Sequence, residues 1–133
     1  MPHINWLAVL AAAVSTFVIG GLWYSPFLFG RAWMAVNNLT DADLAKSNMA
    51  KIFGLSFLLA LIMAANLAAF LAEPKTTAVW GATAGFLAGF GWVALGIATI
   101  ALFERRSWKY VLINGGYMTV SFVVMGLIIG AWR

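Results

Sequence analysis

Side chains that commonly carry catalysis or bind metal ions are scarce in this sequence of 133 residues. It holds four acids, one histidine at position 3 and no cysteine. The absence of cysteine excludes disulfides, thiolate metal sites and cysteine nucleophiles. His3 has no carboxylate beside it, so it does not supply the three protein ligands of a catalytic zinc site. We therefore predict no enzyme activity, no catalytic residue, no metal and no cofactor.

The acidic residues have structural interpretations. Thr40 and Asp43 fit the spacing of a helix N-terminal capping box, in which Asp41 also favours the helix start. The two aspartates could instead bind a cation. Glu104 precedes the arginine pair at 105–106. It could form a buried ion pair that locks a hairpin, or the arginines could bind a lipid phosphate beside it.

Composition separates this chain from soluble proteins. Hydrophobic residues make up 64% and charged residues 9%, against about 45–50% and about 25% in soluble domains. The net charge of +4 could suggest a nucleic-acid partner. We exclude that partner because the basic residues are spread between apolar blocks and form no continuous face.

Four blocks without Asp, Glu, Lys or Arg follow one another, at residues 4–24, 52–72, 78–103 and 110–132. As helices they would be about 31 to 39 Å long, enough to cross a hydrocarbon core about 30 Å thick. Helices are required because lipid offers the backbone no hydrogen bonds. The sequence thus predicts an all-α fold: a single domain over residues 1–133, an integral membrane four-helix bundle.

Charge in the connections predicts the orientation. The longest connection joins helices 1 and 2 at residues 25–51, and the other two are short turns. The first and third connections hold six basic residues, whereas the opposite side holds Lys75 and Arg133. Because basic residues favour the cytoplasm, we predict a cytoplasmic long connection and both termini outside.

Local patterns predict where helices begin and end. Pro26 and Gly30 indicate a break and a turn in an aromatic segment at the membrane interface. A helix is predicted to begin at Asp41 and to run directly into the second span. Pro74 ends the second span, a threonine at 76 or 77 can cap the third, and Ser107 stands where the N-cap of the fourth is expected.

Small residues recur at four-residue spacing, which places them on one helix face. The glycines of this pattern are Gly81, Gly85, Gly89, Gly126 and Gly130. Such faces let two backbones approach closely. They predict helix packing, within one chain or between copies, and we expect a homo-oligomer. A face that slides during transport is the alternative. The glycines at 89, 91 and 96 also permit a local bend.

Uncharged polar and aromatic residues complete the inventory. Asn66 and Asn114 lie within spans, where they either join helices or line a small polar cavity. Most Trp and Tyr residues fall at span ends, as in an aromatic belt at headgroup depth. Trp92 and Tyr117 lie deeper, where a cation–π box for a quaternary ammonium is a further interpretation.

These residues also form a recognisable set. Its members are Asn5-Trp6, Gly21-Leu22-Trp23-Tyr24-Ser25-Pro26, Leu28-Phe29-Gly30, Trp33, Phe103-Glu104, Asn114, Gly116-Tyr117 and Gly126. With them the chain resembles, over nearly its whole length, the small bacterial membrane proteins grouped as domain of unknown function 1761. The resemblance implies a stand-alone four-helix protein of a bacterial inner membrane and no assigned activity.

The resemblance also directs attention to a candidate pocket near the cytoplasmic interface. Its members are Trp23, Tyr24, Ser25, Pro26, Glu104, Asn114 and Tyr117. The hypothesis requires Tyr24 to lie near Glu104 or Asn114.

Two classes of function remain. The first is a self-associating binding or assembly protein whose partners are membrane lipid, further copies of the chain, another membrane protein or a small molecule. The second is an oligomeric small-molecule transporter or channel. The absence of a carboxylate within any span argues against the second, because proton-coupled transport commonly uses one.

Overall fold

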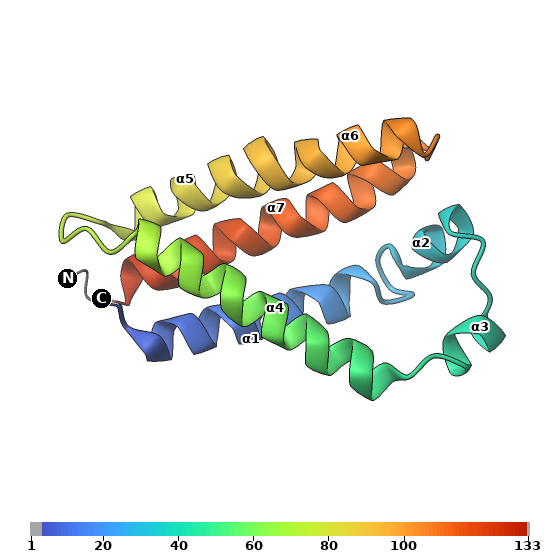
Figure 1. The fold of residues 1–133 in the computed structure, drawn as a ribbon, viewed down its shortest axis with the longest axis horizontal. Helices are drawn as coiled ribbons and strands as arrows, with labels where there is room; N and C mark the ends of the chain where they lie inside the picture. Colours follow the sequence, from blue (N-terminus) through green and yellow to red (C-terminus); the bar gives the residue numbers. More distant parts are fainter. Residues whose placement is uncertain (1–3, 133) are drawn as a thin grey trace.

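The computed structural model describes residues 4–132 and is helical throughout, without strands in that range (Figure 1). Four of its helices are long and apolar enough to cross a membrane. They are α1 (Trp6–Trp23), α4 (Met49–Phe70), the continuous helix formed by α5 (Ala78–Ala88), η1 (Gly89–Ala94) and α6 (Leu95–Phe103), and α7 (Trp108–Ala131). The predicted all-α fold is confirmed, and the chain is a multi-pass membrane protein.

The four long helices begin at polar side chains. Oxygen atoms of Asn5, Asn48, Thr77 and Ser107 each accept a backbone N–H from the first turn of the helix that follows. These bonds satisfy donors that a helix start leaves without an intrahelical partner. The predicted cap at Ser107 is confirmed, and so is a threonine cap for the third span, which the structure assigns to Thr77.

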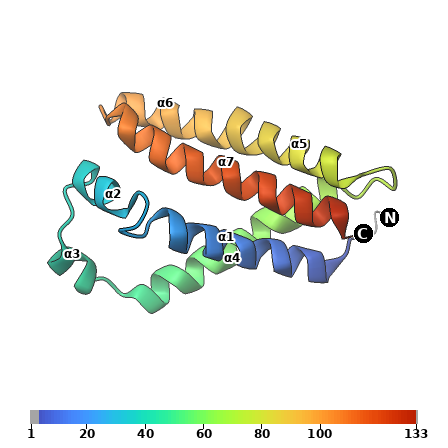
Figure 2. The same ribbon diagram turned by 180° about the vertical axis from the view of Figure 1, so that it is seen from behind.

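The helices alternate in direction. The α4–α5 connection lies at the same end as the chain termini, while the residues between α1 and α4 and the α6–α7 turn lie at the other end (Figures 1 and 2). α5 packs on α7, α7 on α1, and α1 on α4. α4 crosses α1 obliquely, so only its C-terminal half lies close to α7.

Glycines allow α5 and α7 to meet backbone to backbone. A Cβ atom added at Gly81 would collide with the carbonyl oxygen of Gly126, and one added at Gly85 would collide with that of Phe122. At Gly130 the obstacle is the carbonyl of Thr77. The glycine faces of these two helices therefore meet within one chain, an arrangement that the spacing alone left open.

The buried core occupies the half of the molecule nearer the termini. Ala12 of α1 and Ala64 of α4 are both fully buried where these helices cross. They belong to a cluster with Val9, Leu67, Ala68, Leu71, Ala84, Phe122, Met125 and Ile129. Small side chains at the crossing let the helices close this end of the molecule.

The third span contains the predicted irregularity. Gly89–Ala94 forms a π-helical segment between α5 and α6. Glycine lowers the cost of leaving α-helical geometry because its own helix propensity is about 1 kcal/mol below that of alanine. π-helical segments often mark functional sites, and this one places Trp92 on the surface.

The long connection forms two short helices, α2 (Gly30–Val36) and α3 (Asp41–Ala45). Thr40 and Asp43 make the predicted capping box. The prediction that this helix continues into the second span is wrong. α3 ends at Ala45, and α4 starts anew after Asn48, whose side chain accepts the N–H of Lys51. A second local cap competes with helix continuation here.

Candidate functional site

Trp23 and Tyr24 fasten the end of α1 to α7. The indole Nε1–H of Trp23 donates to the carbonyl oxygen of Ile113 at 2.8 Å. The Tyr24 hydroxyl donates to Oδ1 of Asn114 at 2.7 Å. The Asn114 amide in turn donates to the carbonyl of Tyr110 at 3.2 Å. The polar atoms thereby gain partners at a depth where water is scarce.

Tyr24 is also the centre of an aromatic group. Its ring makes edge-to-face contacts with Trp33, at 5.7 Å between centroids, and with Tyr117, at 5.3 Å. The Tyr117 hydroxyl donates to the carbonyl of Thr16 at 3.1 Å. Four of the predicted pocket residues (Trp23, Tyr24, Asn114 and Tyr117) thus lie together, with Trp33 beside them.

The other predicted pocket residues have different surroundings. Ser25 donates to the carbonyl of Leu22 at 2.7 Å and forms part of the turn after α1. Pro26 is exposed in that turn. Glu104 is exposed at the end of α6, and no bond joins it to the aromatic group in the described structure. The expectation of a buried ion pair at Glu104 is therefore wrong.

Arg106 contacts the end of α2 instead of forming the expected ion pair with Glu104. Its guanidinium donates to Oδ1 of Asn37 at 3.3 Å and to the carbonyl of Val36 at 3.5 Å. It also lies 4.7 Å from the centroid of the Tyr110 ring. A cation at the end of α2 is favoured by the helix dipole, so Arg106 ties the long connection to the α6–α7 turn.

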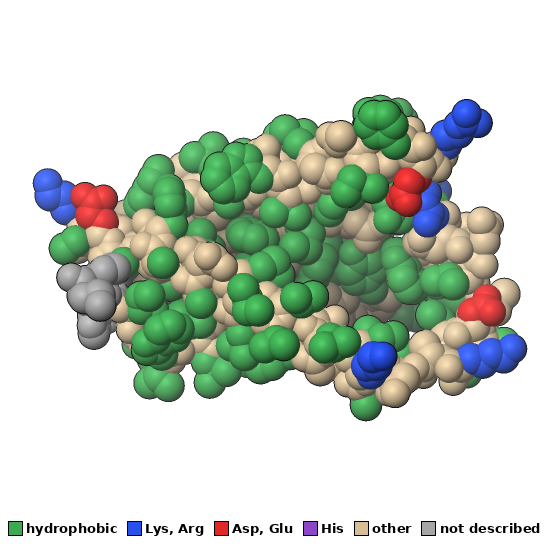
Figure 3. Space-filling model, in the orientation of Figure 1, with side chains coloured by type: hydrophobic (Ala, Val, Ile, Leu, Met, Phe, Trp, Pro, Cys, Tyr) green, Lys and Arg blue, Asp and Glu red, His purple; other side chains and the backbone are tan. Residues whose placement is uncertain are grey.

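A cleft of about 970 Å³ opens where α4 diverges from α1. In the space-filling view it is the hollow between the helices toward the end with the long connection (Figure 3). The residues that line it are Thr16, Phe17, Gly20, Gly21, Tyr24, Trp33, Leu44, Ser47, Met49, Ile52, Phe53, Ser56 and Tyr117. The aromatic group around Tyr24 forms one wall.

The chemistry of this cleft is apolar and poor in hydrogen-bond donors. The described lining residues are all uncharged. The hydroxyls of Thr16, Ser47, Tyr24 and Tyr117 each donate to an oxygen of the protein, whereas the hydroxyl of Ser56 makes no hydrogen bond in the described structure. The cleft therefore presents aromatic faces, aliphatic groups and hydroxyl oxygen atoms. It suits an apolar group better than an anion.

Sequence reasoning missed the α4 side of the cleft. Met49, Ile52 and Phe53 are ordinary span residues, and nothing in their spacing separates them from lipid-facing neighbours. Gly21 is part of the family motif, and the structure shows open space around a Cβ added there. Only the oblique path of α4 makes these residues face α1.

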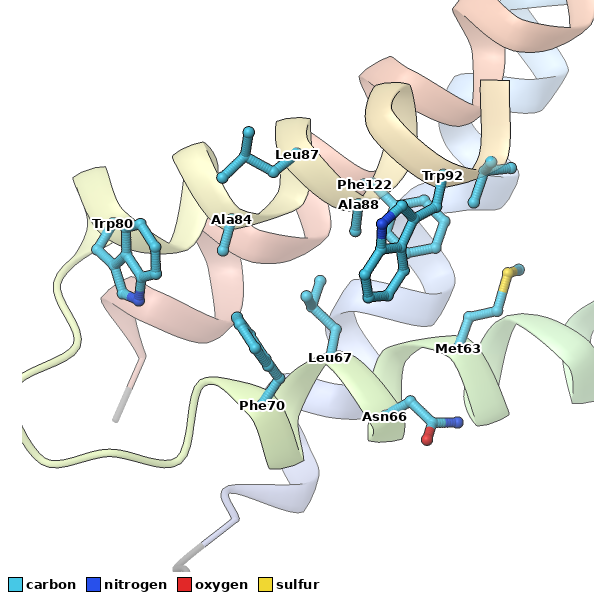
Figure 4. Close-up of a pocket in the computed structure, with 11 residues that line it drawn as sticks. Met63, Asn66, Leu67, Phe70, Trp80, Ala84, Leu87, Ala88, Trp92 and Phe122 are labelled. Carbon is cyan, nitrogen blue, oxygen red and sulfur yellow. The ribbon is translucent and has the colours of Figure 1, made fainter. Parts of the chain in front are cut away.

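A second, smaller cavity of about 550 Å³ lies between α4 and α5 (Figure 4). Phe70, Trp80, Trp92 and Phe122 are among the side chains around it. Asn66 also lines it, is exposed, and donates to the carbonyl of Ile62 at 2.9 Å. Asn66 and Asn114, both predicted to join helices or line a polar cavity, thus lie in different parts of the molecule.

No group of three His, Cys, Asp or Glu residues within 4–132 is arranged to hold a metal ion. Asp41 and Asp43 are both exposed at the start of α3. Hydrogen bonds from the backbone N–H and hydroxyl of Thr40 hold the pKa of the Asp43 carboxyl below its usual value. That carboxylate serves the helix cap. His3 lies outside the described residues.

The comparisons with known proteins give one match. Residues 7–130 match the family described as "Protein of unknown function (DUF1761)". No curated protein and no solved structure matches the chain significantly. Because the match covers nearly the whole chain and reaches into all four long helices, the protein belongs to the DUF1761 family.

Proposed function

We propose that this protein is a membrane-embedded binding protein that holds an apolar small molecule in the cleft between α1 and α4. The cleft is the observation that carries the proposal. Its volume of about 970 Å³ lies at the upper end of the range of about 300–1,000 Å³ typical of small-molecule sites. Its aromatic and aliphatic lining matches an apolar ligand. The proposal includes no catalysis, since no acid or histidine is among the described lining residues.

The closed end of the cleft favours binding over passage. Beyond Thr16 and Ser56 the two helices converge, and Ala12 and Ala64 are fully buried at their crossing. A molecule that enters from the end with the long connection therefore meets packed protein halfway across. A pocket with one closed end suits retention of a ligand.

Transport is the second candidate function, and the same geometry supports it. A cleft open toward one side and closed by alanines toward the other resembles one state of an alternating-access cycle. Small residues at the crossing would let α4 move against α1. The missing membrane carboxylate still argues against coupling to protons.

We further propose that copies of the chain self-associate. The exposed Asn66 amide supports this proposal. One of its N–H groups donates to the Ile62 carbonyl, and its other N–H and its oxygen remain able to bond on an exposed surface. An amide can pair with a second amide across helices.

Asn66→Leu should lower the mass of the particle in mild detergent, whereas Thr99→Val, at another exposed position, should not. Equal masses for both variants would contradict this role of Asn66.

The proposed location is the inner membrane of a bacterium, with both termini outside the cytoplasm. The charge asymmetry of the connections supports this orientation. A reporter fused to the C-terminus and active only in the cytoplasm should remain inactive. Activity of that reporter would reverse the proposed orientation.

Photolabelling with a neutral alkyl diazirine in lipid nanodiscs tests the proposed ligand site. Gly21→Phe should fill the cleft without displacing backbone, because space around that position is open. Gly96→Phe is the matched control, since Gly96 also has open space and does not line the cleft. We expect labelling at Phe17 and Phe53 in the native protein and the control, and its loss in Gly21→Phe.

Two results would contradict the ligand site. One is unchanged labelling of Phe53 in Gly21→Phe. The other is labelling of native protein that is no stronger in the cleft than at lipid-facing residues such as Leu102 and Phe103, which are also exposed.

A further inference from the structure

We infer that the ligand is an amphiphile with an acidic head group, bound with its apolar chain in the cleft and its head at the rim. This inference rests on the proposed function and adds the chemical class and the direction of the ligand.

The inner cleft excludes a head group. An acidic head needs hydrogen-bond donors or cations when it leaves water. Inside the cleft, the hydroxyls of Tyr24, Tyr117 and Thr16 already donate to protein oxygens. Phe17, Ile52 and Phe53 offer only apolar contact, and the Ser56 hydroxyl, which makes no hydrogen bond in the described structure, is too little for a charged head group. An apolar chain fits this interior, and a charged head must remain outside.

The rim supplies cations. Arg31, Lys46 and Lys51 are exposed and belong to α2, the C-cap of α3 and the first turn of α4, segments that also contribute lining residues to the cleft. Figure 3 shows basic side chains around this end of the hollow, together with acidic ones. The basic residues thus come from three separate elements at the end of the molecule where the cleft opens.

The acids at this mouth offset the cations only in part. Asp41 and Asp43 are both exposed at the start of α3, and the hydrogen bonds from Thr40 favour the ionised form of the Asp43 carboxyl. Glu104 lies across the cleft at the end of α6, where Arg105 and Arg106 follow it. An excess of positive charge remains at this end, which favours an anion at the rim and disfavours a cation.

The aromatic group could instead favour a ligand with a cationic head group, but the positive charge near the cleft disfavours such a ligand. Tyr24, Trp33 and Tyr117 could surround a quaternary ammonium through cation–π contacts. However, no carboxylate is among the described residues of that wall, and the nearby rim repels a cation. The rings serve better as the apolar wall of a chain-binding site.

Four twelve-carbon probes with one tail and different heads test the inference: dodecanoate, dodecyl phosphate, dodecanol and dodecyltrimethylammonium. Each competes, below its micelle concentration and at pH 8, with diazirine labelling of Phe53 in nanodiscs of neutral lipid. We expect at least one of the two anions to displace the label at concentrations about tenfold lower than dodecanol and the ammonium, as a few exposed charges allow. The preferred anion distinguishes a carboxylate source from a phosphate source.

The rim residues are tested in the same assay. The triple variant Arg31→Gln, Lys46→Gln, Lys51→Gln should lose the tenfold preference and keep its affinity for dodecanol. Lys75→Gln, at the opposite end of the molecule, is the control and should keep the preference. Retention of the preference in the triple variant would overturn the assigned head-group site.

The outcomes separate this inference from the proposed function. Equal competition by all four probes, or strongest competition by the ammonium, would overturn the acidic head while an apolar site remains. Failure of every probe, together with the absence of cleft labelling, would overturn the proposed function itself.

Discussion

Tyr24 and Asn114 stand 90 positions apart in the chain and share a hydrogen bond of 2.7 Å. The bond uses the hydroxyl proton of Tyr24 and one oxygen of the amide, whose nitrogen bonds to Tyr110. Neither residue is therefore a free polar group waiting for a ligand. Their first role is to fix α1 on α7, and the aromatic wall of the cleft results from that fixation.

Removal of this bond should destabilise the protein. Asn114→Leu leaves the Tyr24 hydroxyl without a partner, at a cost of about 1–3 kcal/mol. Tyr24→Phe removes the hydroxyl itself and should cost less, near the average of about 0.6 kcal/mol for such bonds in membranes. Thermal unfolding in detergent measures both. A double variant whose loss equals the sum of the single losses would show that the two groups do not interact.

Ser121 should behave in the opposite way. It is 1% exposed in α7, and its hydroxyl has no hydrogen-bond partner in the described structure. Ser121→Ala removes an unsatisfied polar group and should stabilise the protein by about 1 kcal/mol. The control is Thr119→Val, which loses the bond to the Gly115 carbonyl. A lower melting temperature for Ser121→Ala would reveal a hydroxyl partner.

At the scale of elements, the α5–α7 contact depends on missing side chains. Gly85→Leu places a side chain where the Phe122 carbonyl lies, and overpacking of this kind costs about 3 kcal/mol or more. We expect the helices to separate and the melting temperature to fall. Gly96→Leu has open space around its Cβ and serves as the control. Equal melting of the two variants would contradict the assigned contact.

The connection between α3 and α4 illustrates the limit of local signals. Thr40 and Asp43 correctly predicted where α3 begins. The sequence after Asp43 remained compatible with one long helix, because no proline interrupts it before the second span. Asn48 nevertheless caps a new helix. An asparagine within a helical pattern fits both a cap and an interior position, and the path of α4 away from α3 selects the cap.

At the scale of the whole molecule, one half is packed and the other holds the cleft. The chain lacks cysteine, so single cysteines can map this division. Ser56→Cys, in the cleft, should react with a membrane-impermeant maleimide added on the side of the long connection. Ala64→Cys, at a position that is 0% exposed, should not react. Reaction of both would contradict the closed end.

The same measurement needs a control cysteine at an exposed position outside the cleft, where lipid would surround it. Leu55 is adjacent to Ser56 and exposed, but it does not line the cleft. Leu55→Cys should remain unlabelled because a thiol needs water to ionise before it reacts. Equal labelling of positions 55 and 56 would indicate that the cleft carries no more water than the lipid-facing surface.

Part of the candidate site could be predicted because its residues are chemically unusual within a span. Trp23, Tyr24, Asn114 and Tyr117 are polar or amphipathic, and each must find partners in a membrane. Glu104 shares that polarity, but it lies past the last turn of α6 and remains in water. The family resemblance grouped Glu104 with the others, but membership of one sequence motif does not place residues together in space, and Glu104 lies apart.

The amino-acid sequence alone determined that the chain enters a membrane as four helices. Each uncharged block is long enough to cross, and its backbone N–H and C=O groups cannot bond to lipid, so they must bond within a helix. The sequence also determined the cap at Ser107 and a threonine cap for the third span, because caps depend on neighbours in sequence. Only the tertiary structure decided that the glycines of α5 meet those of α7 and that α4 crosses α1 obliquely. Both outcomes depend on which backbones approach each other most closely. Because α4 meets α1 closely only at their crossing, the cleft between them stays open at one end.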